Sequence, residues 1–132
     1  MESNKDIRWK QRFQNFNLSF ILLENSLAID SPNVTERAGI IQFYEITFEL
    51  AWKILKDYLE EEGFNVKSPR EVIKLAFQNE IISNGHSWLE ALDNRNITTH
   101  TYDETTALSV ELQIRQTYFP LLKNLRQWLS QR

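Results

Sequence analysis

The sequence predicts an all-α fold, an up-and-down bundle of about four to five helices that forms a single domain over residues 1–132. Apolar residues recur along the chain at spacings of three and four, the pattern of amphipathic helices that pack on one another. The chain holds only 3 Gly and 3 Pro, fewer turn formers than most β-sandwiches and barrels use. Its length of 132 residues suits one domain with a real core and leaves no room for a second catalytic domain.

Two long helices are predicted in the first half of the chain. The first carries the stripe Trp9, Phe13, Phe16, Phe20, Leu23 and Leu27, and we expect it to end at the turn-forming residues 30–33. The second carries a wider apolar face between Ile40 and Leu59, which suits a helix packed on two neighbours. Gly63 is well placed for the left-handed residue just beyond that helix.

The aromatic residues of the second helix have two interpretations. Tyr44, Phe48 and Trp52 lie at four-residue spacing, and we interpret them as core rather than as a platform for base stacking. Glu45 and Glu49 flank this stripe and could enter an interface, although a solvated helix edge is the more common case.

Shorter helices are expected in the second half. Ser68, Pro69 and Glu71 have the spacing of a capping box that starts a short helix. Residues 79–85 are expected to form a loop before a fourth helix, which turns Trp88 inward.

The last predicted helix covers about residues 103–128. Thr101 and Glu104 have capping-box spacing, so Thr101 is the expected cap of this helix. Pro120 lies inside it and predicts a kink or break near residues 118–119.

Composition excludes several function classes. The chain has no Cys, which rules out disulfides, thiolate metal sites and cysteine catalysis. The net charge of -3 argues against nonspecific electrostatic binding of nucleic acid over a broad surface. It does not exclude a small local site for phosphate. No apolar run reaches about 18 residues and no signal peptide is recognised, so we expect a cytoplasmic protein that does not cross a membrane.

Residues 93–104 lack the apolar spacing expected of a helix that only supports the fold. Ile97 is their only aliphatic residue, and their Asn, Thr and Asp side chains compete with a helix for backbone hydrogen bonds. Arg95, His100 and Tyr102 lie together in this stretch. Side chains that donate, accept and titrate are therefore concentrated here.

Arg95 and His100 suit phosphoryl chemistry. Arginine matches phosphate oxygens in bidentate fashion, and histidine acts as acid or base near neutral pH. Asn96 is placed to orient the imidazole or to hold a phosphate oxygen. No carboxylate cluster with Mg²⁺ spacing stands out, so we expect neither a metal nor a cofactor. The competing interpretation is a helix-capping corner that does no chemistry.

The spacing of Arg95 and His100 limits how they can meet. Five residues of a straight α-helix rotate by about 500°, which leaves the two side chains roughly 140° apart. They share a site if the helix ends between them, or if they meet across the two-fold axis of a homodimer.

The motif from Arg95 to His100, followed by Tyr102, resembles the Arg-four-residues-His-X-Tyr motif of HEPN-domain proteins. The chain is similar above all to their nucleotidyltransferase substrate-binding branch, over nearly its whole length. The matching stretches are WKQRF (9–13), QFYEITFELAWK (42–53), KDYL (56–59), SPRE (68–71) and DNRNITTHTYDE (93–104).

This resemblance implies a dimeric all-α toxin that pairs with a minimal nucleotidyltransferase encoded nearby. The toxin would be a metal-independent endoribonuclease, silenced when the partner transfers AMP to Tyr102. An adenylyl group there adds bulk and negative charge two residues from His100, where an RNA phosphate must lie.

The resemblance also implies roles for the motif residues. Arg95 would steady the pentavalent phosphate, His100 would act as acid and base, and Asn96 would be a polar helper. Thr99 and Asp103 would support them. The motif supplies only one histidine per chain, while the reaction needs both an acid and a base. This favours a symmetric dimer, in which two copies of the motif supply both.

Two alternatives stay open. The chain could be a non-catalytic subunit that presents a substrate or nucleotide to the nucleotidyltransferase, which its acidic charge favours. It could also be an assembly protein whose dimer buries aromatic faces without chemistry.

Overall fold

A computed structural model of the chain describes residues 4–132, with side chains from residue 8 onward, and this part is entirely helical. The predicted all-α class is confirmed. The elements are α1 (Asn4–Leu27), α2 (Val34–Glu61), α3 (Pro69–Gln78), α4 (Gly85–Asp93), the 3₁₀ helix η1 (Asn94–His100), α5 (Glu104–Gln113), the π-helical turn η2 (Ile114–Tyr118) and α6 (Phe119–Ser130). No helix within residues 4–132 is long and apolar enough to cross a membrane.

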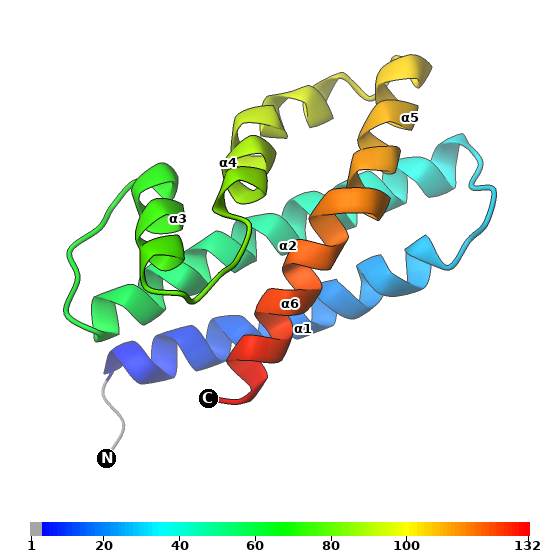
Figure 1. Ribbon diagram of the computed structural model, residues 1–132. Coiled ribbons are helices and arrows are strands. Elements are labelled where there is room, and N and C mark those ends of the chain that lie inside the picture. Colours follow the sequence, from blue (N-terminus) through cyan, green and yellow to red (C-terminus); the bar gives the residue numbers. More distant parts are fainter. Residues whose placement is uncertain (1–3) are drawn as a thin grey trace.

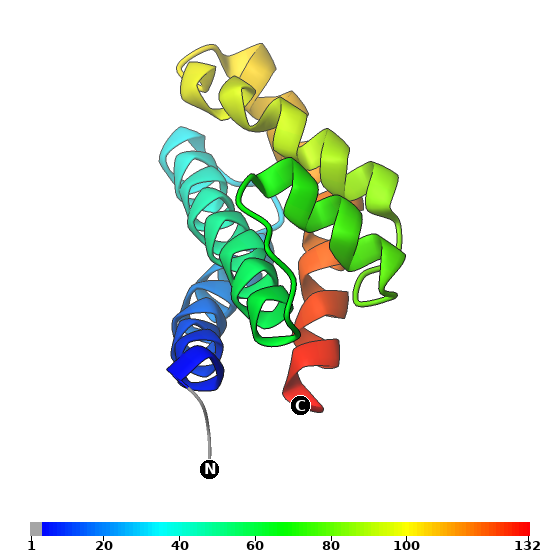
Figure 2. The ribbon, with the colours of Figure 1, turned by 90° about the vertical axis from the view of Figure 1, so that its left-hand side faces the viewer.

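The helix α2 lies at the centre of the bundle. It forms a long hairpin with α1, and it also contacts α3, α5, α6 and η1 (Figure 1). Figure 2 shows the hairpin on one side of the molecule, with α3, α4 and the rod of α5, η2 and α6 on the other. Because α2 has neighbours on several sides, it needs the wide apolar face that the sequence predicts.

The core is rich in aromatic contacts between helices. Trp9, Phe16, Phe20 and Leu23 of the predicted α1 stripe are buried, while Phe13 and Leu27 pack at its margin. The ring of Phe20 stacks on Phe119 of α6 with 5.1 Å between centroids. Such pairs stabilise a fold beyond the area they bury. They fix α6 against the hairpin.

Gly63 ends α2 as predicted. It has φ 98°, and its amide donates to the carbonyl of Glu60. The amide of Phe64 donates to the carbonyl of Leu59, which completes a Schellman motif. Only glycine adopts this φ without steric cost.

Side-chain caps begin the next helices. Ser68 caps α3 as predicted, with its hydroxyl accepting from the amide of Glu71 at 3.2 Å. Asn33 caps α2 in a full capping box with Glu36, a start signal that was not among the predicted ones.

The expected cap of α5 at Thr101 is wrong. Thr101 has φ -78° and ψ 0°, a turn conformation, because η1 continues through His100 just before it. A capping residue needs extended backbone, which Asp103 has at φ -82° and ψ 117°. Asp103 therefore caps α5, and its carboxylate accepts from the amide of Thr105 at 3.3 Å.

The predicted break in the last helix is confirmed. The turn η2 lies directly before Pro120, whose ring removes a backbone donor and forces the ladder of hydrogen bonds to shift. Since α5 and α6 continue through this turn, the described part of the chain forms five helical rods.

A buried ion network ties this rod to the turn between α1 and α2. The carboxylate of Glu111 accepts from Arg37 Nε and from Arg115 Nε, each at 2.8 Å. The Arg115 guanidinium also donates to the carbonyls of Leu27 at 2.8 Å and Ile29 at 3.1 Å. These donors satisfy carbonyl oxygens that the end of α1 leaves unpaired.

Candidate functional site

The polar segment 93–104 lies where α4 ends and α5 begins. Its start is tied to α3 by an ion pair between Asp93 and Arg70. Its second residue is tied to η2, because the Asn94 amide donates to the Tyr118 hydroxyl at 3.3 Å. Two contacts with neighbouring helices thus anchor the start of a segment that has no hydrophobic stripe.

Two threonine hydroxyls bond back to the backbone of the 3₁₀ helix. Thr98 donates to the carbonyl of Arg95 at 2.6 Å, and Thr99 donates to the carbonyl of Asn96 at 2.8 Å. Such local side-chain bonds give backbone carbonyls a partner within the segment. Thr98 is also buried, which anchors the segment to the core.

Arg95 points toward α2. Its Nη1 lies 3.5 Å from Oε1 of Glu49, and the two side chains are 46% and 43% exposed. An exposed pair of this length contributes little to stability. The guanidinium therefore stays accessible to an anion that competes with Glu49.

His100 contacts Tyr102 instead. Its Nδ1 lies 3.1 Å from the Tyr102 hydroxyl, and the two rings meet edge to face with 5.8 Å between centroids. The His100 side chain is exposed, and Tyr102 is 85% exposed, the highest value among the large hydrophobic residues described. Both groups can thus be reached by a macromolecule without any opening of the fold.

Of the two arrangements that would bring Arg95 and His100 together, the structure does not show a helix end between them. Both residues belong to η1. Five residues of a 3₁₀ helix rotate by about 600°, so the two side chains leave it roughly 120° apart. A single chain therefore does not bring the two side chains together. The other predicted arrangement is a contact between the two copies across the axis of a homodimer.

The remaining predicted residues surround this pair. Asn96 is exposed on η1 next to Arg95. Thr99 is exposed and holds the turn through its bond to the Asn96 carbonyl. Asp103 uses its carboxylate on the amide of Thr105 and the hydroxyl of Thr106, so it fixes the corner at the start of α5.

A hollow of about 230 Å³ lies beside Arg95. Its lining is Tyr44, Glu45, Phe48, Glu49, Arg95, Asn96 and Thr98. Burial raises the pKa of Tyr44 well above its ordinary value, so this phenol stays neutral. Glu45 and Glu49 are half-buried at the edge of the α2 aromatic stripe and line this hollow. Their position next to the buried aromatic stripe was the available signal.

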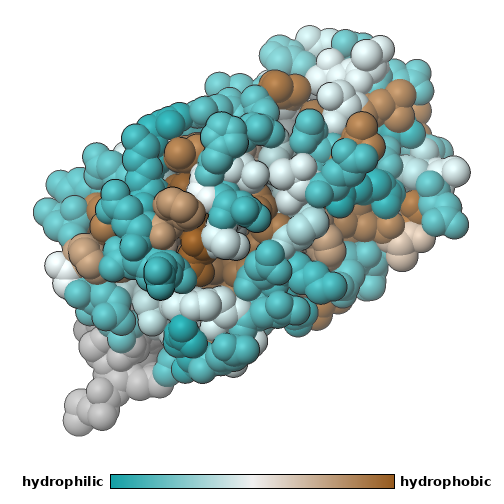
Figure 3. Space-filling model, viewed as in Figure 1, coloured by the Kyte–Doolittle hydropathy of each residue, from teal (hydrophilic) through white to brown (hydrophobic). Residues whose placement is uncertain are grey.

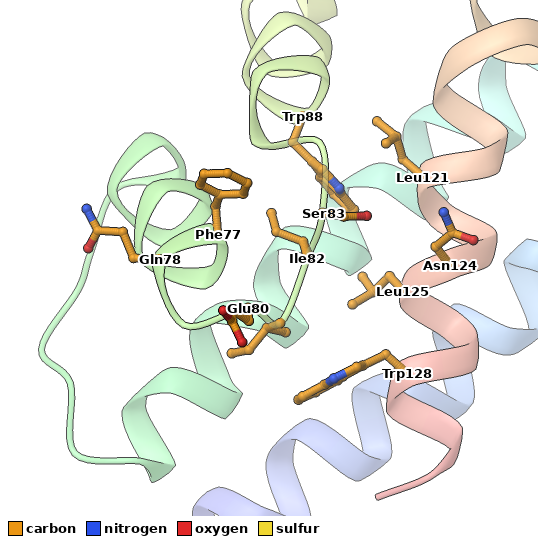
Figure 4. A pocket seen from close by; sticks show the side chains of 11 residues that line it. Phe77, Gln78, Glu80, Ile82, Ser83, Trp88, Leu121, Asn124, Leu125 and Trp128 are labelled. Atoms are coloured by element: carbon orange, nitrogen blue, oxygen red, sulfur yellow. The ribbon is translucent and has the colours of Figure 1, made fainter.

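A larger hollow lies elsewhere, between the α3–α4 loop and α6, and measures about 600 Å³. Figure 3 shows hydrophobic residues in this region, and Figure 4 shows Ile82, Trp88, Leu125 and Trp128 around it. No Arg, Lys or His lines it. Because phosphoryl chemistry needs such groups, we place the candidate site at the other end of α4, on η1.

Metal-binding clusters are also missing from the described residues. Within residues 4–132, no group of three or more His, Cys, Asp or Glu side chains could hold a metal ion.

Comparison with known proteins places the chain among relatives. The profile of the family described as nucleotidyltransferase substrate binding protein like matches residues 11–131. The chain is 33% identical over 98 residues to the probable ribonuclease HepT of Haemophilus influenzae, over 68% of this chain and 67% of that protein.

Two solved structures share its fold. One, from Haemophilus influenzae, is described as the fold of a substrate-binding domain of a nucleotidyltransferase. It has a TM-score of 0.82 and 26% identity over 89% of this chain and 98% of that chain. A Thermus thermophilus protein has a TM-score of 0.77 and 31% identity over 83% of this chain and 94% of that chain.

Proposed function

The chain belongs to the family of nucleotidyltransferase substrate-binding-like proteins, and from this membership we propose that it is the toxin of a pair with a minimal nucleotidyltransferase. The toxin is a metal-independent endoribonuclease that acts in the cytoplasm, and AMP transfer to Tyr102 inactivates it. One observation carries the proposal: Arg95, His100 and Tyr102 are exposed together on one polar segment, in a chain similar to a probable ribonuclease.

The proposed reaction is transesterification of RNA. The ribose 2′-OH attacks the adjacent phosphorus, the bond to the 5′-oxygen breaks, and a 2′,3′-cyclic phosphate forms. Arg95 stabilises the added negative charge on the phosphate oxygens. His100 takes the 2′-OH proton in one copy and protonates the leaving 5′-oxygen in the other. The reaction needs positioning and proton transfer, which these side chains supply.

A homodimer completes this site in the proposal. Arg95 and His100 leave η1 in different directions, so a second copy is needed to place an arginine near a histidine. Three exposed apolar residues belong to η1 and to α5, which contact each other: Ile97 at 43%, Leu108 at 46% and Leu112 at 52% exposure. We call them the motif-side patch and place the dimer contact there.

The dimer contact is tested by Leu108→Glu, which introduces a charge into the motif-side patch. We expect the mass in solution to fall from dimer to monomer. Leu22→Glu is the matched control, because Leu22 is a helical residue of α1 with 49% exposure. A dimer that tolerates Leu108→Glu but not Leu22→Glu would move the contact to α1.

The catalytic proposal is tested with purified protein, single-stranded RNA and a chelator. Wild type should cleave, and His100→Ala and Arg95→Ala should lose at least about a hundredfold in rate. His86→Ala is the control, because His86 is the second histidine and is exposed on α4. Equal cleavage by wild type and His100→Ala, or no cleavage by either, would overturn the ribonuclease proposal.

A second candidate function is a non-catalytic subunit that presents a substrate or nucleotide to the nucleotidyltransferase. The net charge of -3 favours it, since RNA-binding proteins usually carry positive charge. Co-purification with the nucleotidyltransferase, followed by intact mass after incubation with ATP, separates the two. A stable complex without RNA cleavage supports the second function, and an added AMP on Tyr102 supports the first.

A further inference from the structure

We propose that Tyr102 is a positioning residue for His100 as well as the acceptor of AMP. Its phenolic oxygen holds Nδ1 of the imidazole and leaves Nε2 as the nitrogen that exchanges a proton with RNA. Adenylylation of that oxygen then disables His100 itself. This inference rests on the proposed function and names how the same site is regulated.

The geometry of the pair supports the assignment. The Tyr102 oxygen and His100 Nδ1 lie 3.1 Å apart, within hydrogen-bond distance. The rings meet edge to face at 75°, an arrangement compatible with this contact between Nδ1 and the hydroxyl. Among the described side chains, no other one hydrogen-bonds the His100 ring. Tyr102 is therefore the side chain that can set its orientation.

The fixed corner before α5 keeps the two residues in register. Asp103 follows Tyr102 directly and caps α5 through the amide of Thr105. The amide of Asp103 also donates to the carbonyl of His100 at 3.2 Å, which closes the turn that carries both rings. An exposed tyrosine held on such a turn has less freedom to leave its partner.

The required chemistry identifies the useful tautomer. Neutral imidazole carries one proton, and its other nitrogen accepts. When Nδ1–H donates to the Tyr102 oxygen, Nε2 keeps its lone pair and takes the 2′-OH proton. The imidazolium that forms retains the Nδ1–H bond. In the copy that acts as acid, Nε2 gives its proton to the 5′-oxygen, and the same tautomer results. One contact thus serves both roles.

Adenylylation removes this contact. The Tyr102 oxygen attacks the α-phosphorus of ATP, the new P–O bond forms, pyrophosphate leaves, and the phenolic proton is lost. The ester oxygen shares its electrons with phosphorus and is a weaker acceptor for Nδ1–H. The added nucleotide also forces the ring away from His100. The modification thus acts on the orientation and tautomer of the imidazole, in addition to blocking RNA.

The first test is Tyr102→Phe, which keeps the ring and removes the oxygen. We expect kcat for RNA cleavage to fall by about tenfold or more with KM unchanged, because proton transfer is affected and binding is not. If Tyr102 is only the acceptor of AMP, Tyr102→Phe cleaves RNA like the wild type and resists the nucleotidyltransferase. That result would overturn the inference while leaving the proposed ribonuclease intact.

The second test observes the imidazole directly and does not need activity. Two-bond proton–nitrogen NMR spectra report the tautomer of each histidine, and the chain has only His86 and His100. In Tyr102→Phe and in the adenylylated protein, the Nδ1–H fraction of neutral His100 should change while His86 stays constant. An unchanged His100 would contradict the positioning role. Absence of cleavage by the wild type, with a changed His100, would instead count against the ribonuclease alone.

Discussion

The buried network around Glu111 makes a strong prediction about stability. Glu111→Gln keeps the shape of the side chain and removes the charge that Arg37 and Arg115 share. The side chains of Glu111 and Arg37 are only 12% and 11% exposed, so water replaces little of the lost interaction. Removing one partner of a fully buried ion pair costs about 3–5 kcal/mol.

The expected loss here is somewhat smaller. Arg115 keeps its bonds to the carbonyls of Leu27 and Ile29, and Arg37 keeps its bond to the carbonyl of Pro32 at 3.0 Å. We therefore expect the free energy of unfolding to fall by about 2–3 kcal/mol. For a chain of this length, that corresponds to a drop of roughly 6–12 °C in Tm. Urea titration at pH 7 measures the first quantity, and calorimetry measures the second.

The pH dependence gives the prediction a second signature. Burial alone raises the pKa of Glu111, but the hydrogen bonds and charges of Arg37 and Arg115 outweigh it and hold the pKa below its ordinary value of 4.5. A carboxyl whose pKa is lowered by folding stabilises the protein above the unfolded pKa, and this contribution is lost as pH falls through the folded pKa. The gap between wild type and Glu111→Gln should thus shrink below about pH 4.5.

Glu24→Gln is the control, because Glu24 is exposed on α1 and its loss should change stability by less than about 0.5 kcal/mol. A Glu111→Gln variant that unfolds within about 0.5 kcal/mol of the wild type at pH 7 would refute the argument, since the network would then contribute no more than a surface pair.

Three further substitutions test the structure. Gly63→Ala should cost about 1 kcal/mol in urea titration, because alanine is strained at φ 98°. Gly39→Ala, within α2 and with open space at the new methyl, should instead stabilise by about 0.5–1 kcal/mol, and a loss there would contradict the described packing. Glu49→Gln should change the free energy of unfolding by less than about 0.5 kcal/mol, because its pair with Arg95 is half exposed; a larger loss in urea would show that this pair is structural.

The helices could be predicted because burial repeats along them. The α1 residues Phe16, Phe20 and Leu23 are fully buried, and their spacing alone identifies the buried face. The break before Pro120 could also be predicted, because a missing amide acts locally whatever packs around it. The start of α2 also has a signal in the sequence, the capping-box spacing of Asn33 and Glu36.

The conformation of the site could not be predicted in the same way. Segment 93–104 has no hydrophobic period, so residue spacing does not distinguish a 3₁₀ helix from an α-helix or a loop there. Glu49 was missed as a neighbour of Arg95 because the two lie 46 residues apart in sequence. Residue types predicted which groups can do chemistry, but the packing of η1 on α2 decides which groups meet.

The π-helical turn η2 divides the last rod into two helices, α5 and α6, which pack in different places. In η2 the amide of Phe119 reaches back five residues to Ile114, and Pro120 then supplies no amide at all. The ladder of hydrogen bonds is thus interrupted between α5, which begins at the Asp103 corner, and α6, which is held in the aromatic core. Opening of α6 need not propagate into α5, because local unfolding follows cooperative units. The amides of the two helices can therefore exchange with solvent as separate units, while the Glu111 network keeps α5 and its corner tied to the turn between α1 and α2.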